Sequence, residues 1–147
     1  MNVFTIGFTK KSAKTFFELI KKNDINLLID IRLNNVSQLA GFTKGKDLEF
    51  FLKEICQCKY IHEINFAPTK DILDDYKSKR ISWQEYESKF IYLLNKRDVI
   101  SLFSTKGFLN HKNICLLCSE PTSEKCHRRL LAEYLREKFS NINIIHL

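Results

Sequence analysis

Short apolar runs alternate with helical patterns along the whole of this chain. The runs that have the length and composition of strands lie at residues 3–6, 27–31, 59–62, 114–117 and 142–145. The run at 27–31 is apolar almost throughout, not just at every second residue, which is typical of a parallel strand buried on both faces. This alternation predicts an α/β fold with a mostly parallel, five-stranded sheet and helices on both of its faces.

Helix signals fill the gaps between these strands. Ser12 fits the N-cap of the first helix, and Ser82 begins a capping box with Glu85. Gly107 is placed to close a short helix. Further helical patterns lie near residues 48–55, 72–76 and 99–103, and a last helix is expected to open near Ser123.

The length favours one domain. The chain has 147 residues, with only 4 Gly and 2 Pro, so no linker is indicated. We therefore predict a single Rossmann-like domain over residues 1–147. Right-handed crossovers favour the strand order 3-2-1-4-5, which would place the first and fourth strands side by side.

The charge and the cysteines limit the partners and the compartment. The formal net charge of +7 favours an anionic small molecule or nucleic acid as partner, although scattered lysines on a solvated surface would give the same charge. Five cysteines show no disulfide framework, the N-terminus lacks the pattern of a signal peptide, and no apolar run approaches the ~20 residues of a membrane span. We expect a cytoplasmic protein with reduced thiols and no membrane partner.

Residues 118–129 are the stretch richest in reactive groups. Cys118, Glu120, Cys126, His127 and Arg128 follow the fourth strand and lead into the last helix. A loop between the carboxyl end of a strand and the start of a helix is where α/β proteins bind and transform ligands. The sequence therefore indicates a reactive site at this loop.

Polar groups from two other strand ends are expected at the same edge of the sheet. Gly7 and Thr9 follow the first strand, and Arg32 follows the second. In the expected strand order, two arginines can reach an anion lying above Gly7, which has no side chain to block it. The predicted catalytic residues are Cys118, Glu120 and His127, and the predicted substrate- or anion-binding residues are Gly7, Thr9, Arg32, Cys126 and Arg128.

These residues also have plainer interpretations. Cys118 near a helix N-terminus is either a nucleophile with a lowered pKa or a small buried core residue. Arg32 and Arg128 either fork onto a phosphate or pair with Asp30 and Glu120 at the strand ends. Both interpretations stay open from the sequence alone.

A metal site is not expected. Cys118, Cys126 and His127 include the ligand types of zinc, but their spacing is unlike that of a zinc finger or ribbon. If Cys126 and His127 are adjacent on a helix, their side chains point about 100° apart. The prediction is therefore no metal and no cofactor.

Several motifs resemble one known family, the domain of unknown function 488 family. The motifs are Thr5-Ile6-Gly7, Asp30-Ile31-Arg32, Trp83-x-x-Tyr86, Cys118-x-Glu120-x5-Cys126-His127-Arg128 and Ile144-Ile145-His146-Leu147. The chain differs from the family pattern at Phe8, where a His is frequent, at Asn35, where a Pro is frequent, and at 65–68, a loop that is frequently rich in glycine. The resemblance implies a shared fold and a shared site, without a settled reaction.

These observations favour a small enzyme, a hydrolase or transferase assisted by a thiol or a carboxylate. Its substrate would be anionic and phosphate- or nucleotide-like, bound at the carboxyl edge of the sheet. The alternative is a binding module that uses the same site to hold a nucleotide or nucleic acid without chemistry.

Overall fold

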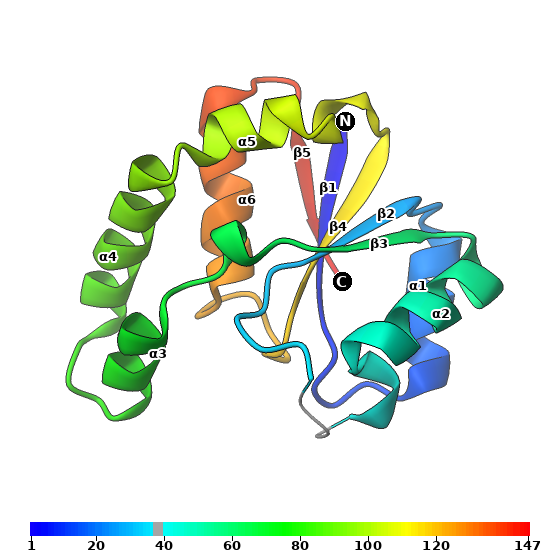
Figure 1. Ribbon diagram of the computed structural model, residues 1–147, viewed down its shortest axis with the longest axis horizontal. Helices are drawn as coiled ribbons and strands as arrows, with labels where there is room; N and C mark the ends of the chain where they lie inside the picture. The colour runs from blue at the N-terminus through cyan, green and yellow to red at the C-terminus, as the bar shows by residue number, and fades with distance from the viewer. Residues whose placement is uncertain (37–39) are drawn as a thin grey trace.

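The protein is built on one five-stranded sheet (Figure 1). The computed structural model describes residues 1–36 and 40–147. Its strands are β1 (Asn2–Gly7), β2 (Leu27–Asp30), β3 (Lys59–His62), β4 (Asn113–Cys118) and β5 (Asn143–His146), and all of their pairings are parallel. The prediction of an α/β fold is confirmed.

The strand order is β3-β2-β4-β1-β5, so the predicted order 3-2-1-4-5 is wrong. Strand β4 lies between β1 and β2, and the first and fourth strands are neighbours as expected. The rule of right-handed crossovers permits either order and cannot choose between them. The burial of β4 explains the outcome, because all of its residues are buried and the centre of the sheet is the place where both faces are covered.

Helices cover both faces of the sheet (Figure 1). The helices are α1 (Ala13–Lys22), α2 (Gly45–Cys56), α3 (Lys70–Lys77), α4 (Trp83–Lys96), α5 (Val99–Thr105) and α6 (His127–Lys138), with short 3-10 helices at Gly41–Thr43, Ile64–Phe66 and Phe108–Asn110. A hydrophobic core lies on each face of the sheet, and successive residues of β4 point into one core and then the other. Ile114 and Leu116 pack with α4, α5 and α6, whereas Cys115 and Leu117 pack with α1 and α2.

Local signals in the sequence set most of the helix starts. The Ser12 side chain accepts a hydrogen bond from the backbone N–H of Thr15, and Ser82 and Glu85 form the expected capping box at the start of α4. Gly107 follows α5 with a φ of +73°, the left-handed conformation that glycine adopts at least cost. These positions agree with the prediction.

The start of α6 differs from the prediction. The helix begins at His127 with Cys126 as N-cap, and not near Ser123. The carbonyl groups of Glu120 and Glu124 accept hydrogen bonds from the side chains of Arg128 and Arg129. The carbonyl groups of segment 119–126 therefore bind arginine side chains in place of helical N–H groups, and the segment forms turns between β4 and α6.

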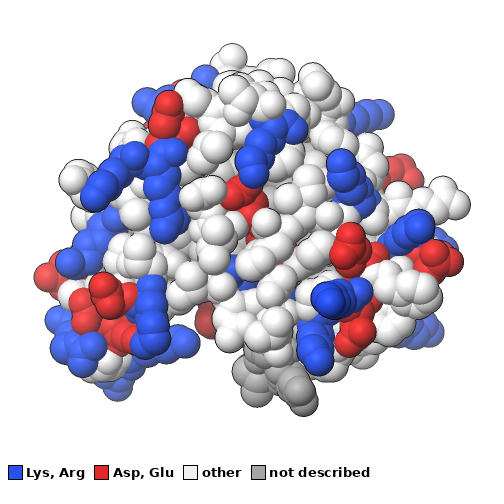
Figure 2. Space-filling model, viewed as in Figure 1, with Lys and Arg blue, Asp and Glu red and all other residues white. Residues whose placement is uncertain are grey.

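The surface carries its positive charge in scattered form. Figure 2 shows lysine and arginine side chains distributed over the visible face, with acidic side chains among them. Within residues 1–36 and 40–147, none of the helices is both long enough and apolar enough to cross a membrane.

Gly7 is held in close contact with segment 119–126. A Cβ atom added to Gly7 would lie 1.7 Å from the carbonyl oxygen of Glu120 and 3.0 Å from Nη1 of Arg128. Gly41 is the matched control, because an added Cβ there would meet no atom of the described residues within 4 Å. A Gly→Ala substitution adds the same methyl group at both positions, so only the space around that group differs.

We expect Gly7→Ala to lower the free energy of unfolding by roughly 1–3 kcal/mol, the usual cost of overpacking, because segment 119–126 must move away. Gly41→Ala should change it little. Denaturant unfolding of the two variants measures the difference. Equal stability of both variants would mean that segment 119–126 is not held against β1.

Candidate active site

The carboxyl ends of three neighbouring strands form the candidate active site. Gly7 ends β1, Asp30 ends β2 and Cys118 ends β4. Gly7 pairs with Cys118, and Asp30 pairs with Leu117, so these strand ends lie next to one another. The segments that carry the predicted site residues are brought together, although through a different strand order.

Cys118 and His127 form a buried pair. The Sγ atom of Cys118 lies 3.6 Å from Nδ1 of His127, and Nε2 of His127 lies 3.0 Å from the carbonyl oxygen of Ile31. A carbonyl oxygen only accepts hydrogen bonds, so Nε2 carries a proton and donates it. This contact leaves Nδ1 as the atom that exchanges a proton with Cys118.

The surroundings favour the charged form of this pair. Burial alone would raise the pKa of Cys118, but the neighbouring Cys126 thiol and the His127 imidazole stabilise its thiolate and hold that pKa well below the ordinary value. Burial alone would lower the pKa of His127, but the charge of the Cys118 thiolate raises it above the ordinary value. Both shifts favour a thiolate beside an imidazolium, the state in which a cysteine is most nucleophilic.

Cys126 lies beside this pair as the N-cap of α6. Its backbone is extended, with φ −141° and ψ 138°, and Nη1 of Arg128 lies 3.4 Å from its Sγ atom. The interaction with Cys118 and burial both raise the pKa of Cys126, although Arg128 opposes them. The two shifts make Cys118, and not Cys126, the thiol that ionises more readily.

The same three residues are the group that could hold a metal ion. The ligand atoms of Cys118, Cys126 and His127 lie within 4.8 Å of one another. The argument that Cys126 and His127 must point apart is wrong, because Cys126 precedes the helix and has extended backbone angles. The contact of the Arg128 guanidinium with Sγ of Cys126 favours a free thiol there, although two cysteines and one histidine with an open fourth position are also a ligand set of catalytic zinc sites.

Arg32 is paired with Asp30 beneath the site. Its Nε and Nη2 atoms donate to the two Asp30 oxygens at 2.8 and 2.6 Å, and Nη2 also donates to the carbonyl oxygen of Thr43 at 2.8 Å. Tyr60 donates to the same carboxylate at 2.7 Å, and Arg32 lies 5.3 Å from the centre of the Phe8 ring. For Arg32 the structure therefore shows the pair with Asp30.

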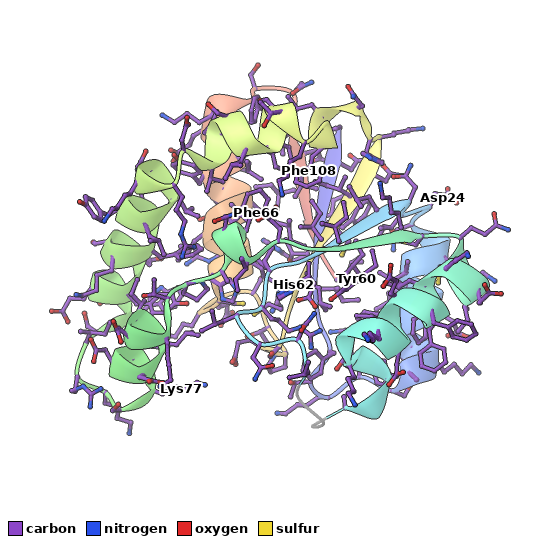
Figure 3. The ribbon with its side chains drawn as sticks, viewed as in Figure 1. Asp24, Tyr60, His62, Phe66, Lys77 and Phe108 are labelled. Carbon is purple, nitrogen blue, oxygen red and sulfur yellow. The ribbon has the colours of Figure 1, made fainter. Side chains whose placement is uncertain are left out.

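Neighbouring β3 side chains brace this pair. Tyr60 and His62 both lie on β3 (Figure 3), and Nε2 of His62 donates to the carbonyl oxygen of Arg32 at 2.8 Å. Burial, followed by the charge of Asp30, raises the pKa of Tyr60, so its hydroxyl stays protonated and remains a donor. The network fixes the conformation of the chain just after β2.

Arg128 binds the backbone of Glu120 and not its carboxylate. Nη1 of Arg128 donates to the Glu120 carbonyl oxygen at 2.6 Å, while the Glu120 side chain is exposed. That carbonyl group occupies the space above Gly7, so the expectation of an anion above Gly7 is wrong for this conformation. Thr9 is exposed, and its N–H donates to the Ser119 carbonyl oxygen at 3.2 Å, which is a further contact between segment 119–126 and the chain after β1.

Within residues 1–36 and 40–147, each arginine nevertheless has a buried nitrogen atom without a partner. These atoms are Nη1 of Arg32 and Nε of Arg128. The two residues are 3% and 1% exposed, so no bulk solvent replaces the missing bonds. A buried donor without a partner is costly and points to an acceptor outside the described part of the chain.

A comparison of the sequence with protein families finds a match over residues 12–135, to the family described as Domain of unknown function DUF488. The chain belongs to the DUF488 family. No curated protein and no solved structure matched the chain.

The candidate site of this DUF488 domain also contains groups that the sequence did not reveal. The carbonyl group of Ile31 orients His127, and the carbonyl group of Thr43 helps to hold Arg32. Backbone carbonyls carry no signal in the residue type, so sequence patterns could not have found them. Tyr60 could have been predicted as a partner of Asp30, because it lies on the strand that pairs with β2.

Arg129 fastens segment 119–126 to α4. It donates to the Glu124 carbonyl oxygen at 3.1 Å and to Glu87 at 2.8 Å, and its guanidinium lies 6.0 Å from the centre of the Trp83 ring. Trp83 stacks on Tyr86 at 5.0 Å on its own helix. Because Trp83 already contacts Tyr86 and Arg129, its role is in the packing around the candidate site of the DUF488 domain.

The buried pair at the end of β2 should matter far more to stability than an exposed pair. Asp30 is completely buried, and its loss leaves Arg32 charged and unpaired inside the domain. We expect Asp30→Ala to lower the free energy of unfolding by about 3–5 kcal/mol. Asp74→Ala removes the exposed pair with Lys70 and should change the free energy of unfolding far less, because solvent screens that pair. Similar losses in denaturant unfolding would contradict a special role for the buried pair.

The ionised thiol can be observed without any substrate. We expect the ultraviolet absorbance of a thiolate to persist well below pH ~8.5, the pKa of a free cysteine. Cys118→Ser should remove this absorbance, and His127→Ala should shift its loss to higher pH because the stabilising positive charge is gone. Cys56→Ser is the control, since burial raises the pKa of Cys56. A Cys118→Ser variant with unchanged absorbance would refute the ion pair.

Proposed function

We propose that this DUF488 protein is a small cytoplasmic enzyme that acts on an anionic, phosphate- or nucleotide-like substrate, with Cys118 as its nucleophile. The observation that carries the proposal is the buried chain of contacts from Cys118 through His127 to the Ile31 carbonyl group. A cysteine beside a histidine that is oriented by a third group is the arrangement of activated nucleophiles.

The reaction class is hydrolysis or group transfer. The Cys118 thiolate attacks an electrophilic centre of the substrate, and Nδ1 of His127 gives its proton to the leaving group. The exposed Glu120 carboxylate is available to activate the water or acceptor that releases the covalent intermediate. Each of these groups lies at the end of β4 or at the start of α6.

Three observations support an anionic substrate. Nη1 of Arg32 and Nε of Arg128 are buried donors that have no partner among the residues the structure describes. The first turn of α6 has neither an acidic residue nor a side-chain cap, so its N–H groups and helix dipole favour negative charge. The net charge of +7 attracts anions over longer distances.

Segment 119–126 must move for a substrate to reach the thiol. Cys118 is 3% exposed, and the segment is held by the contacts of Glu120 with Arg128 and of Glu124 with Arg129. An anion that replaces the Glu120 carbonyl group at Arg128 would satisfy the guanidinium and release the segment at the same time. Anion binding and access to Cys118 are thus coupled in this proposal.

The second candidate function is a binding module for a nucleotide or nucleic acid. The low exposure of Cys118 favours it, because a buried cysteine is frequently a structural residue. In that case anions bind the domain, but Cys118 stays unreactive.

Two alkylating reagents with different charges test both parts of the proposal. Iodoacetate is an anion and iodoacetamide is neutral, but both alkylate thiolates by the same reaction. We expect the ratio of iodoacetate to iodoacetamide labelling, followed by mass spectrometry at neutral pH, to be roughly tenfold higher at Cys118 than at Cys56. Cys56 is the internal control because it is partly exposed and lies on α2, away from the strand ends.

Inorganic phosphate should slow the labelling of Cys118 and leave that of Cys56 unchanged. If Cys118 reacts only after unfolding, it is not the nucleophile, and the binding module becomes the better account. If it reacts in the folded protein without preference for iodoacetate and without protection by phosphate, the thiol is active but the substrate is not an anion.

A further inference from the structure

Cys126 has no part in the reaction described above, yet it is the thiol beside the nucleophile. Its Sγ atom lies within 4.8 Å of Sγ of Cys118, and the two residues are 2% and 3% exposed. A disulfide requires the sulfur atoms to approach to about 2.05 Å, which a rotation of short cysteine side chains can supply. The extended backbone of Cys126 leaves its side chain outside the regular turns of α6.

The other cysteines cannot compete for Cys118. Cys115 and Cys58 belong to the core between the sheet and helices α1 and α2, and Cys56 packs against that core. Cys118 contacts His127 of α6, on the opposite face of the sheet. Cys126 is therefore the partner that the fold provides.

Hydrogen-bond donors flank both sulfur atoms. Nδ1 of His127 lies 3.6 Å from Sγ of Cys118, and Nη1 of Arg128 lies 3.4 Å from Sγ of Cys126. The guanidinium of Arg128 is positively charged, and Nδ1 of His127 is the atom that exchanges a proton with Cys118, so each sulfur atom can carry negative charge in turn. A thiolate that attacks and a second thiolate that follows it are both stabilised within this cluster.

We propose that Cys118 is a site of oxidation by hydroperoxides and that Cys126 is its resolving cysteine, so that the two residues form a reversible disulfide. This inference rests on the proposed function, because it requires Cys118 to be a reactive thiolate. It adds a means by which an oxidant switches the nucleophile off and a thiol reductant restores it.

The chemistry balances with a hydroperoxide as oxidant. The Cys118 thiolate attacks one peroxide oxygen, the O–O bond breaks, and the departing alkoxide or hydroxide takes a proton from His127. Cys118 is then a sulfenic acid, oxidised by two electrons. Cys126 next attacks the Cys118 sulfur atom, an S–S bond forms, the S–O bond breaks, and the hydroxide leaves as water with the Cys126 proton. An external dithiol reverses the change by two exchange steps and becomes a disulfide itself.

Hydrogen peroxide is the appropriate probe, because it is small enough to reach a thiol of low exposure. The reduced protein is treated with hydrogen peroxide, free thiols are blocked, and a trypsin digest is analysed by mass spectrometry. Lys125 lies between the two cysteines, so trypsin separates them unless a disulfide joins their peptides. The peptide 113–125 also contains Cys115, so its fragment spectrum is used to assign the disulfide to Cys118 or to Cys115. We expect the joined peptides in the wild-type protein and their loss after treatment with a dithiol.

Two variants sharpen the test. Cys126→Ser should leave Cys118 as a sulfenic acid that dimedone traps, whereas Cys56→Ser should form the same disulfide as the wild type. The wild-type digest decides the matter even if Cys126→Ser fails to fold. Joined peptides between any other pair of cysteines would overturn the inference.

The outcomes also separate this inference from the proposed function. If Cys118 is alkylated in the folded protein but forms no disulfide with Cys126, the nucleophile stands and the inference fails. If Cys118 is not alkylated in the folded protein, both fail. A tightly held zinc ion in the purified protein, lost in Cys126→Ser, would show a metal centre in place of a disulfide pair.

Discussion

The hydrogen bond from His127 to the carbonyl oxygen of Ile31 joins the start of α6 to the end of β2. It exists only because β4, which leads to α6, lies next to β2 in the sheet. The bond satisfies a buried carbonyl group and fixes which ring nitrogen faces Cys118. The position of α6 and the chemistry of the thiol thus depend on one contact between segments that are far apart in the sequence.

Buried charge is the second organising feature. Asp30, Arg32 and Arg128 are almost fully removed from solvent, which is tolerable only when such groups are paired and hydrogen-bonded. Asp30 and Arg32 meet this condition through a bidentate contact and through Tyr60. Arg128 meets it less completely, since it contacts a carbonyl group and a thiol but no carboxylate among the described residues. This difference makes Arg128 the more natural of the two arginines to meet an incoming anion.

The elements of the fold were predictable because each has a local cause. Apolar periodicity, the caps at Ser12 and Ser82, and the turn at Gly107 depend on residues close together in the chain. The strand order was not predictable, because the crossover rule permits β4 on either side of β1.

The candidate site was predictable as a set of residues but not as a geometry. Treating Cys126 as helical made its sulfur atom point away from His127, whereas its extended backbone brings the two together. The anion was expected above Gly7 because glycine lacks a side chain. A backbone carbonyl group of segment 119–126 takes that space. Every residue type has such a group, so the sequence does not indicate the contact.

The position of Trp83 gives the protein a built-in optical reporter. It is the single tryptophan of the chain, held between the Tyr86 ring and the guanidinium of Arg129. Arg129 also holds the carbonyl group of Glu124, so a displacement of segment 119–126 changes the electrostatic surroundings of the indole ring. The intrinsic fluorescence of this protein therefore follows the segment that covers Cys118, without any label.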